Sequence, residues 1–335
     1  MKFTLGLDVH KNTTAYALVT EEGGVQERGE IKTDPKQCLD VISWIPKSEL
    51  VIGMESTTFI YPLYDALNDA GYKVKVANPV KLHRITKSAV KYDGKDAKDI
   101  ALQLLRNDFP QSYMLTKEMR DKRELIRQHM TLTQEQTRVK NRIHSHIAKH
   151  NYRLTRGLGS KASFEYLRKI ELPEYARVTL DLMVDQLQRI KKNLKDIDKV
   201  IDDFAHSNED TKKLLNLDGV GVFTAATFYL ELGDWRRFQS AKQLTAYVAL
   251  IPQMSGSANK MYYGRMRFDG NHNLKYAFCR ASEQAIRKDN KYRAFFLRLM
   301  KKGKRRRTAI WAVGNKLLRS CYGILRAENP IYSGS

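Results

Sequence analysis

The chain has 335 residues and a net charge of +22, with 42% hydrophobic and 10% aromatic residues. This composition excludes an intrinsically disordered protein, and the length provides for two or three folded domains. Three cysteines without a CxxC pair argue against a disulfide framework or zinc ribbon, and no apolar run approaches membrane-spanning length. With no signal-peptide pattern at the N-terminus, we expect a soluble, intracellular protein with reduced cysteines.

The first hundred residues predict alternating strands and helices of an α/β domain. The turns between the first three strands are short, so we expect an antiparallel meander. The fourth strand is a nearly continuous apolar run, as expected for a central buried strand. The predicted strands are Phe3–Val9, Thr14–Thr20, Val25–Lys32, Leu50–Glu55 and Lys73–Ala77, and the predicted helices are Pro35–Trp44, Tyr61–Ala70 and about 93–106. The order βββαβαβ followed by a helix is the ribonuclease-H-like layout.

The middle of the chain, residues 111–207, is predicted to be helical. One apolar series repeats at alternating steps of four and three, which is typical of a coiled-coil seam. Its members are Met183, Leu187, Ile190, Leu194, Ile197, Ile201 and Phe204. A second apolar series predicts another long helix over about 118–150. Two such helices form an antiparallel hairpin or an oligomer arm, and the spacing does not decide between packing within the monomer and self-association.

The positive charge is concentrated in the last third of the chain. Residues 1–110 sum to about zero, residues 111–230 to about +6, and residues 231–335 to about +16. Basic surfaces attract the phosphate backbone of nucleic acids, so nucleic acid is the expected partner. A merely soluble basic protein is the alternative. We expect three domains, covering residues 1–110, 111–207 and 208–335.

Four carboxylates of the first domain are candidates for a metal site. Asp8 and Glu55 end neighbouring strands, so both should emerge at the same edge of the sheet. Asp93 and Asp96 are three residues apart at the start of the following helix and share one face. Clustered carboxylates repel one another, and oxygen-only ligands select Mg²⁺ or Mn²⁺ for phosphoryl transfer. Helix capping is the alternative for the two aspartates, and Asp99 rivals Asp93 by spacing alone.

Two segments of the C-terminal domain point to nucleic-acid binding. Leu215–Leu232 predicts a helix, a turn with Gly219 and Gly221, and a second helix, which is the helix-hairpin-helix pattern that holds a DNA phosphate. A plain tight turn between packed helices is the alternative. Tyr262–Phe268 interleaves arginines with aromatic residues, as nucleic-acid-binding surfaces often do. The cations of this basic surface are Arg265, Arg267, Arg280, Lys301, Lys302, Lys304, Arg305, Arg306 and Arg307. A mobile solvated loop is the alternative for the run Lys301–Arg307.

The segment Ile251–Lys260, IPQMSGSANK, is predicted to be a loop because of its proline, its glycine and its small hydroxyl residues. Ser255 or Ser257 is a candidate nucleophile. No GxSxG elbow is present, and the spacing alone favours a serine in a turn.

The motifs around these residues resemble the insertion-sequence transposases of the IS110 type and the related site-specific invertases of the Piv type. In the N-terminal domain the resemblance rests on GLDVHK, MEST and KYDGKDA, which carry the four carboxylates. In the C-terminal domain it rests on LLNLDGVGVFTAA, FQSAKQLTAYVALIPQMSGS, GNHNLKYAF and KLLRSCYGIL. The resemblance extends in order over nearly the whole chain and is weakest in the middle.

This resemblance implies a RuvC-like domain with a DEDD metal site, a coiled-coil stalk and a C-terminal domain with a catalytic serine. The implied DEDD residues are Asp8, Glu55, Asp93 and Asp96, and the D-x-x-D-A pattern favours Asp93 over Asp99. The implied nucleophile is Ser255, with Ser257 as second choice. In the implied reaction the metal site polarises a scissile phosphate, and serine attack forms a phosphoserine intermediate that preserves bond energy for rejoining.

The resemblance also implies partners and a location. A structured noncoding RNA would pair with target and donor DNA, and the protein would form a dimer or tetramer through the coiled coil in the prokaryotic cytoplasm, associated with the nucleoid. Lys275 falls where an arginine is common in relatives and is an implied phosphate contact. The alternatives are a RuvC-like, metal-only nuclease that resolves Holliday junctions and a non-catalytic nucleic-acid-binding scaffold.

Overall fold

The computed structural model describes residues 2–79, 81–82, 93–154, 157–257, 260–267 and 269–327. Within these ranges, residues 93–95, 254–257, 260–263 and 265 are described by their backbone alone. The chain divides into two compact units, Met1–Lys117 and Glu118–Ser335. None of the helices in the described ranges is both long and apolar enough to cross a membrane.

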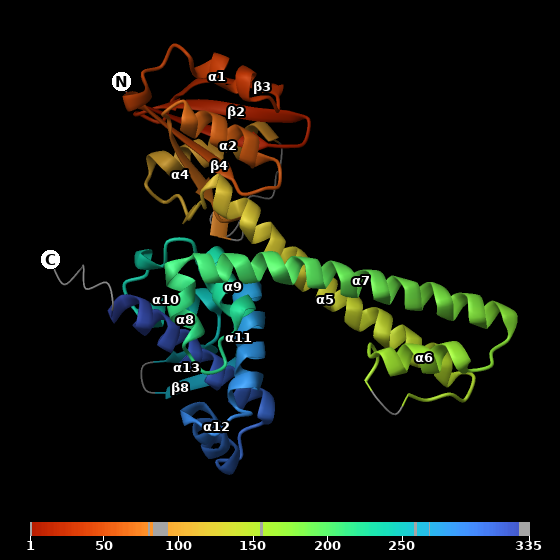
Figure 1. Ribbon diagram of the computed structural model, residues 1–335. Helices are drawn as coiled ribbons and strands as arrows, with labels where there is room; N and C mark the ends of the chain where they lie inside the picture. The colour runs from red at the N-terminus through yellow and green to blue at the C-terminus, as the bar shows by residue number, and fades with distance from the viewer. Residues whose placement is uncertain are drawn as a thin grey trace. The chain divides into compact units, whose positions relative to one another are not determined.

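The first unit is a mixed sheet with helices (Figure 1). Its strand order is β3-β2-β1-β4-β5-β6, with β1 antiparallel to β2 and parallel to β4. The strands are β1 (Phe3–Val9), β2 (Thr13–Thr20), β3 (Val25–Lys32), β4 (Leu50–Glu55), β5 (Lys73–Ala77) and the short β6 (Gln111–Ser112). The predicted meander, the central position of β4 and the element order βββαβαβ are confirmed.

The side-chain alternation along β1 divides the sheet into two different faces. Leu5 and Leu7 point to a face where buried apolar residues of β4, α1 and α2 form one core cluster. The opposite face carries Gly6 and Gly53, and the helix α4 packs there. The helices of this unit are α1 (Pro35–Ile42), the short 3₁₀ helix η1 (Lys47–Glu49), α2 (Ile60–Asp69) and α4 (Asp93–Leu105).

The two glycines set how closely α4 approaches the sheet. A Cβ atom on Gly6 would lie 1.9 Å from the carbonyl oxygen of Ala97, and a Cβ atom on Gly53 would lie 2.5 Å from Leu104 Cδ1. A larger residue at Gly6 would therefore have to displace the backbone of α4, whereas one at Gly53 would have to displace the Leu104 side chain. The amino-terminal half of α4 consequently lies over β1, and its carboxyl-terminal half lies over β4.

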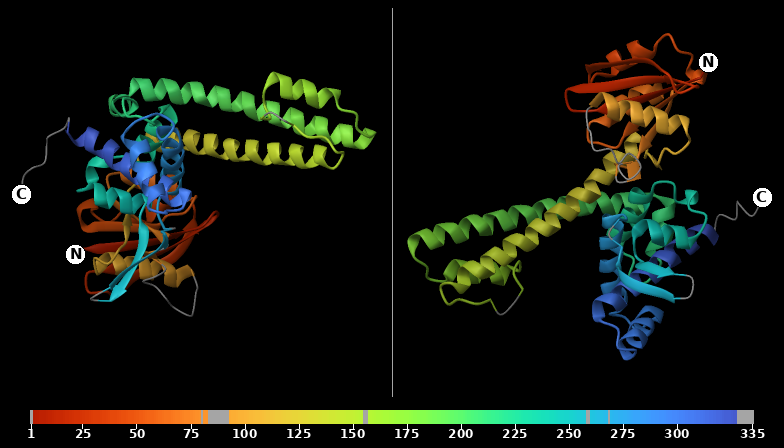
Figure 2. Two further views of the ribbon diagram at one scale, coloured as in Figure 1. Left: turned by 90° about the horizontal axis from the view of Figure 1, so that it is seen from below. Right: turned by 180° about the vertical axis from the view of Figure 1, so that it is seen from behind.

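The second unit begins with two long helices that run side by side (Figure 2). These are α5 (Lys117–Ala148) and α7 (Glu174–Ser207), and the short α6 (Lys161–Lys169) packs near the connection between them. The predicted apolar seam of α7 is buried against α5, with Leu187 fully buried and Ile190 5% exposed. Packing within the monomer is thus the alternative that the structure supports for this seam.

The rest of the second unit is mainly helical, as predicted. Its elements are α8 (Glu209–Leu215), α9 (Val222–Leu232), the 3₁₀ helix η2 (Trp235–Arg237), α10 (Ala241–Val248), β7 (Pro252–Ser257), β8 (Lys260–Met266), α11 (His272–Ala285), α12 (Lys291–Lys301) and α13 (Arg306–Ala327). Phe228, Phe278 and Leu317 lie fully buried in the core that joins α9, α11 and α13.

One predicted loop is a strand in the structure. Residues Pro252–Ser257 form β7 and pair antiparallel with β8, so the prediction of a loop over Ile251–Lys260 was wrong. The sequence shows turn-forming residues in this segment, but it does not show that Pro252–Ser257 has β8 as a pairing partner.

Candidate carboxylate site and nucleic-acid interface

Asp8 and Glu55 are brought together by the register of the sheet. The parallel pair β1–β4 matches Leu7 with Met54, so Asp8 and Glu55 stand one step further along at the carboxyl ends of both strands. Adjacent strands lie about 5 Å apart, and both residues have the parity of the face covered by α4. The Asp8 side chain is 13% exposed. Two carboxylates thus meet at one half-buried edge.

The start of α4 lies over the same part of the sheet. Ala97 packs with Ala15, and Ala15 is the register partner of Asp8 on β2. Asp96 directly precedes Ala97 and is half-buried. Asp93 begins the helix four residues before Ala97, about 6 Å away along the helix axis. The side chain of Asp93 lies outside the described residues. The backbone therefore places the start of α4 near the Asp8 end of the sheet.

The donor chemistry at this edge fits a divalent cation. Asp8 and Glu55 offer only oxygen atoms, which Mg²⁺ and Mn²⁺ prefer, and half-buried neighbouring carboxylates repel unless a cation lies between them. Sequence reasoning did not single out His10, whose Nε2 atom lies 3.3 Å from Asp8 Oδ2. Among side chains that the structure describes, no three His, Cys, Asp or Glu residues already form a complete ligand set.

The two candidate nucleophiles lie in the second unit. Ser255 is paired with Tyr262 across the β7–β8 hairpin, and Ser257 is paired with Lys260. The backbone of both serines is therefore held in a regular strand. Their side chains lie outside the described residues, as does that of Arg265.

The two glycines of the predicted helix-hairpin-helix have different surroundings. Gly219 has φ +87°, and a Cβ atom there would lie 2.4 Å from Ala285 Cβ on α11. Gly219 is therefore needed for packing between helices, which is not the open phosphate approach predicted for it. Gly221 is exposed, has open space around its Cβ position and stands at the N-cap of α9. The α9 amino terminus stays accessible at Gly221.

Several predicted nucleic-acid-binding cations have partners within the protein. Arg267 donates two hydrogen bonds to Asp269, at 2.8 and 2.7 Å. Lys275 donates from Nζ to the carbonyl oxygen of Arg267 at 2.9 Å. Arg306 makes a bidentate ion pair with Glu283. The other predicted cations whose side chains are described are all exposed, namely Arg280, Lys301, Lys302, Lys304, Arg305 and Arg307.

A buried carboxylate that sequence reasoning missed organises the second unit. Glu231 on α9 is 3% exposed and accepts hydrogen bonds from Arg127 Nε at 2.9 Å, Asn271 Nδ2 at 2.8 Å and Asn273 Nδ2 at 2.7 Å. Asn271 also caps α11 by accepting a hydrogen bond from the Leu274 backbone N–H. Burial raises the pKa of Glu231, but these hydrogen bonds and the Arg127 charge outweigh it and leave that pKa below its usual value.

This network joins α5, α9 and the start of α11. Two signals in the sequence could have indicated it. Glu231 is the single charged residue within the apolar helix VFTAATFYLEL, and the motif GNHN places one asparagine before α11 and one in its first turn. Arg127 lies 104 residues from Glu231, so its participation has no local signal.

A mixed sheet with carboxylates at one edge, followed by a strongly basic helical unit, is typical of proteins that cleave and rejoin nucleic acids. A family model described as "Transposase", of the DEDD type, matches residues 5–151, and a model described as "Transposase IS116/IS110/IS902 family" matches residues 211–297. The chain belongs to the IS110-type transposase family of insertion sequences.

Individual relatives agree with this membership. The chain is 25% identical over 262 residues, 76% of this chain and 70% of the relative, to a "Transposase for insertion sequence element IS1111A" of Coxiella burnetii. It is 22% identical over 229 residues, 67% of each chain, to the "Transposase for insertion sequence element IS1328" of Yersinia enterocolitica. A "Pilin gene-inverting protein" of Moraxella bovis is 29% identical over 125 residues, 37% of this chain and 39% of that protein.

A solved structure described as "Thermus thermophilus RuvC structure" matches 33% of this chain and 99% of that chain, at 14% identity and a TM-score of 0.26. The TM-score is low, so the fold of the first unit rests on its own strand order and register.

Proposed function

We propose that the protein is a DNA transposase that cleaves and rejoins the ends of an insertion sequence, using a divalent-metal site formed by Asp8, Glu55, Asp93 and Asp96. One observation carries the metal site. The β1–β4 register sets Asp8 beside Glu55 on the face where α4 begins. Bound Mg²⁺ or Mn²⁺ would supply charge stabilisation for the attacking and leaving oxygens of phosphoryl transfer.

In this proposal Ser255 is the nucleophile, and Ser257 is the second choice. The serine Oγ forms a bond to phosphorus while the bond from phosphorus to a deoxyribose oxygen breaks. The hydroxyl proton leaves to solvent, and the released deoxyribose oxygen takes up a proton to become a hydroxyl. A phosphoserine retains the energy of the phosphodiester, so the reverse attack by a DNA hydroxyl rejoins strands without another energy source. Support comes from family membership and from the regular β7–β8 hairpin that holds the serine backbone.

We further propose that a structured noncoding RNA chooses the DNA sites by base pairing. The protein would then recognise the backbone and shape of the nucleic acid, which agrees with a charge of about +16 in residues 231–335 and with exposed Lys304 and Arg305. Purification of the protein from cells that carry the whole insertion sequence should yield a discrete RNA from the element's end. Recovery of only random cellular RNA would contradict the guide.

A suicide DNA substrate tests the chemistry. Wild-type protein with Mg²⁺ should cleave and leave a covalent protein–DNA adduct. Glu55→Gln should abolish cleavage, whereas Glu30→Gln, on the exposed edge strand β3 of the same sheet, should cleave normally. Full cleavage by Ser255→Ala without any adduct would instead indicate a metal-only nuclease. Unchanged activity in Glu55→Gln would indicate a non-catalytic scaffold.

A further inference from the structure

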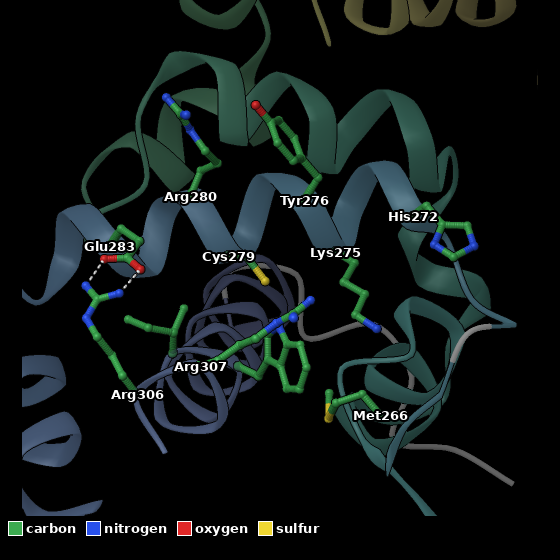
Figure 3. Close-up of a pocket in the computed structure, with 11 residues that line it drawn as sticks. Met266, His272, Lys275, Tyr276, Cys279, Arg280, Glu283, Arg306 and Arg307 are labelled. Carbon is green, nitrogen blue, oxygen red and sulfur yellow. Dashed lines mark hydrogen bonds and ion pairs between the residues drawn. The ribbon is translucent and has the colours of Figure 1, made fainter. Parts of the chain in front are cut away.

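An open groove of about 930 Å³ lies between α11 and the start of α13 (Figure 3). Its walls come from α11 and α13, and Met266 at the end of β8 closes one end. Lys275 and Cys279 point from α11 toward α13, while Arg306 and Arg307 reach into the same space from α13 (Figure 3). The groove is far larger than a single phosphate and has the size of a small-molecule site.

The groove is positively charged. Four of its side chains are cations, namely Lys275, Arg280, Arg306 and Arg307. Its one carboxylate, Glu283, is bound by Arg306 through two hydrogen bonds. Among the described side chains, no carboxylate forms an ion pair with Arg280 or Arg307, and both arginines are exposed. The groove therefore carries an excess of positive charge, with Arg307 on the side of α11 that faces α13 and Arg280 on the opposite side of α11 (Figure 3).

Aromatic rings hold three of these cations in place. Arg307 lies 4.8 Å and Lys275 lies 5.6 Å from the centre of the Trp311 ring. Arg280 lies 6.0 Å from the centre of the Tyr276 ring. Cations that are already positioned lose little conformational freedom when an anion binds.

The lining of the groove also has an apolar part. Ile310, Cys279 and Met266 are among its lining residues, and Ile310 is 5% exposed. A duplex presents its phosphates on a convex surface and has no group to place on an apolar lining. An unpaired nucleotide carries both a phosphate and an exposed base with apolar faces. We propose that this groove binds an unpaired nucleic-acid strand, with Arg280 and Arg307 on different phosphates of the strand and a base against the apolar lining.

The electrostatics of Lys275 agree with an anionic ligand. Burial lowers the pKa of Lys275, and the nearby charge of Arg307 lowers it further. Two cations that repel each other across Trp311 are stabilised when a phosphate enters between them. This inference rests on the proposed function only in taking nucleic acid as the ligand.

Fluorescence anisotropy on the full-length protein tests the groove. The probes are labelled oligodeoxythymidine and oligouridine of about 12 nucleotides and a DNA duplex of equal length. The variant is Arg280→Ala with Arg307→Ala, two exposed positions whose loss should leave the melting temperature unchanged. The control is Arg298→Ala, an exposed arginine that lies 5.2 Å from the Phe295 ring on α12, outside the groove.

The double variant should bind single strands about tenfold more weakly than wild type, and the slope of log affinity against log salt should fall by about 1.4, for two phosphates at about 0.7 each. Duplex binding and the Arg298→Ala control should change less than about twofold. The probe that loses more affinity identifies the strand as DNA or RNA.

Two outcomes overturn the inference. One is single-strand binding by the double variant equal to that of Arg298→Ala, and the other is an equal loss on the duplex. If the wild-type protein binds none of the probes, the proposed function fails as well. If the double variant binds the probes like wild type and cleaves DNA normally, only the inference about the groove fails.

Discussion

Replacement of Glu231 by alanine removes the acceptor at the centre of the buried network in the second unit. Hydrogen bonds to a charged group contribute about 1.5–3 kcal/mol each, and breaking a buried ion pair costs about 3–5 kcal/mol. The Arg127 side chain is 39% exposed and regains water when its partner is lost, so the lower end applies. We expect Glu231→Ala to lower the free energy of unfolding by about 3 kcal/mol.

For a unit of this size, that loss corresponds to a fall of about 6–12 °C in the melting temperature. Differential scanning calorimetry resolves it best, because a two-unit chain need not unfold in one transition. The matched control is Glu124→Ala, which removes an exposed carboxylate 3.5 Å from the same Arg127 and should cost less than about 1 kcal/mol. Equal melting temperatures for Glu231→Ala and Glu124→Ala would refute the assignment of stability to the buried network.

Three further predictions concern packing and pH. Gly6→Ala should destabilise the first unit by more than about 2 kcal/mol in calorimetry, because the new Cβ meets the backbone of α4, whereas Gly24→Ala meets only an ordinary contact at 3.5 Å. The pKa of Glu231 is lower in the folded state than its unfolded value of 4.5. The charged carboxylate therefore stabilises the fold above pH 4.5, and this stabilisation is lost as the pH falls through the pKa of the folded state. The melting temperature of Glu231→Gln should accordingly fall less steeply with acid than that of wild type. Ile190→Glu should reduce helical circular dichroism and lower the melting temperature, whereas Val200→Glu, 53% exposed on the same helix, should do neither. An Ile190→Glu protein that melts like wild type would contradict burial of the seam within the chain.

The fold of the first unit was predictable because its signals are local. Strand order and the short turns of the meander follow from runs of apolar residues and turn residues, and the ends of β1 and β4 were placed at one edge by the same reasoning. The face on which Asp8 and Glu55 lie was not predictable from apolar runs alone. That face is the one where Gly6 and Gly53 leave space for α4 to pack. A glycine in a strand does not by itself indicate which helix packs against it.

The second unit was predictable only in its helical content. The repeat in α7 indicates a buried stripe, but the same spacing serves a neighbouring helix of the chain and a second copy equally well. The Glu231 network and the groove between α11 and α13 depend on residues far apart in the sequence. Such contacts are set by tertiary packing, which leaves no periodic trace in the sequence.

The most direct test of the proposed reaction is the amount of covalent protein–DNA adduct formed on a suicide substrate with Mg²⁺. Wild type should form the adduct, Asp8→Asn should neither cleave nor form it, and Ser255→Ala should form none. Cleavage that persists in Asp8→Asn, or an adduct that persists in Ser255→Ala, would contradict the joint action of the carboxylate edge and the serine.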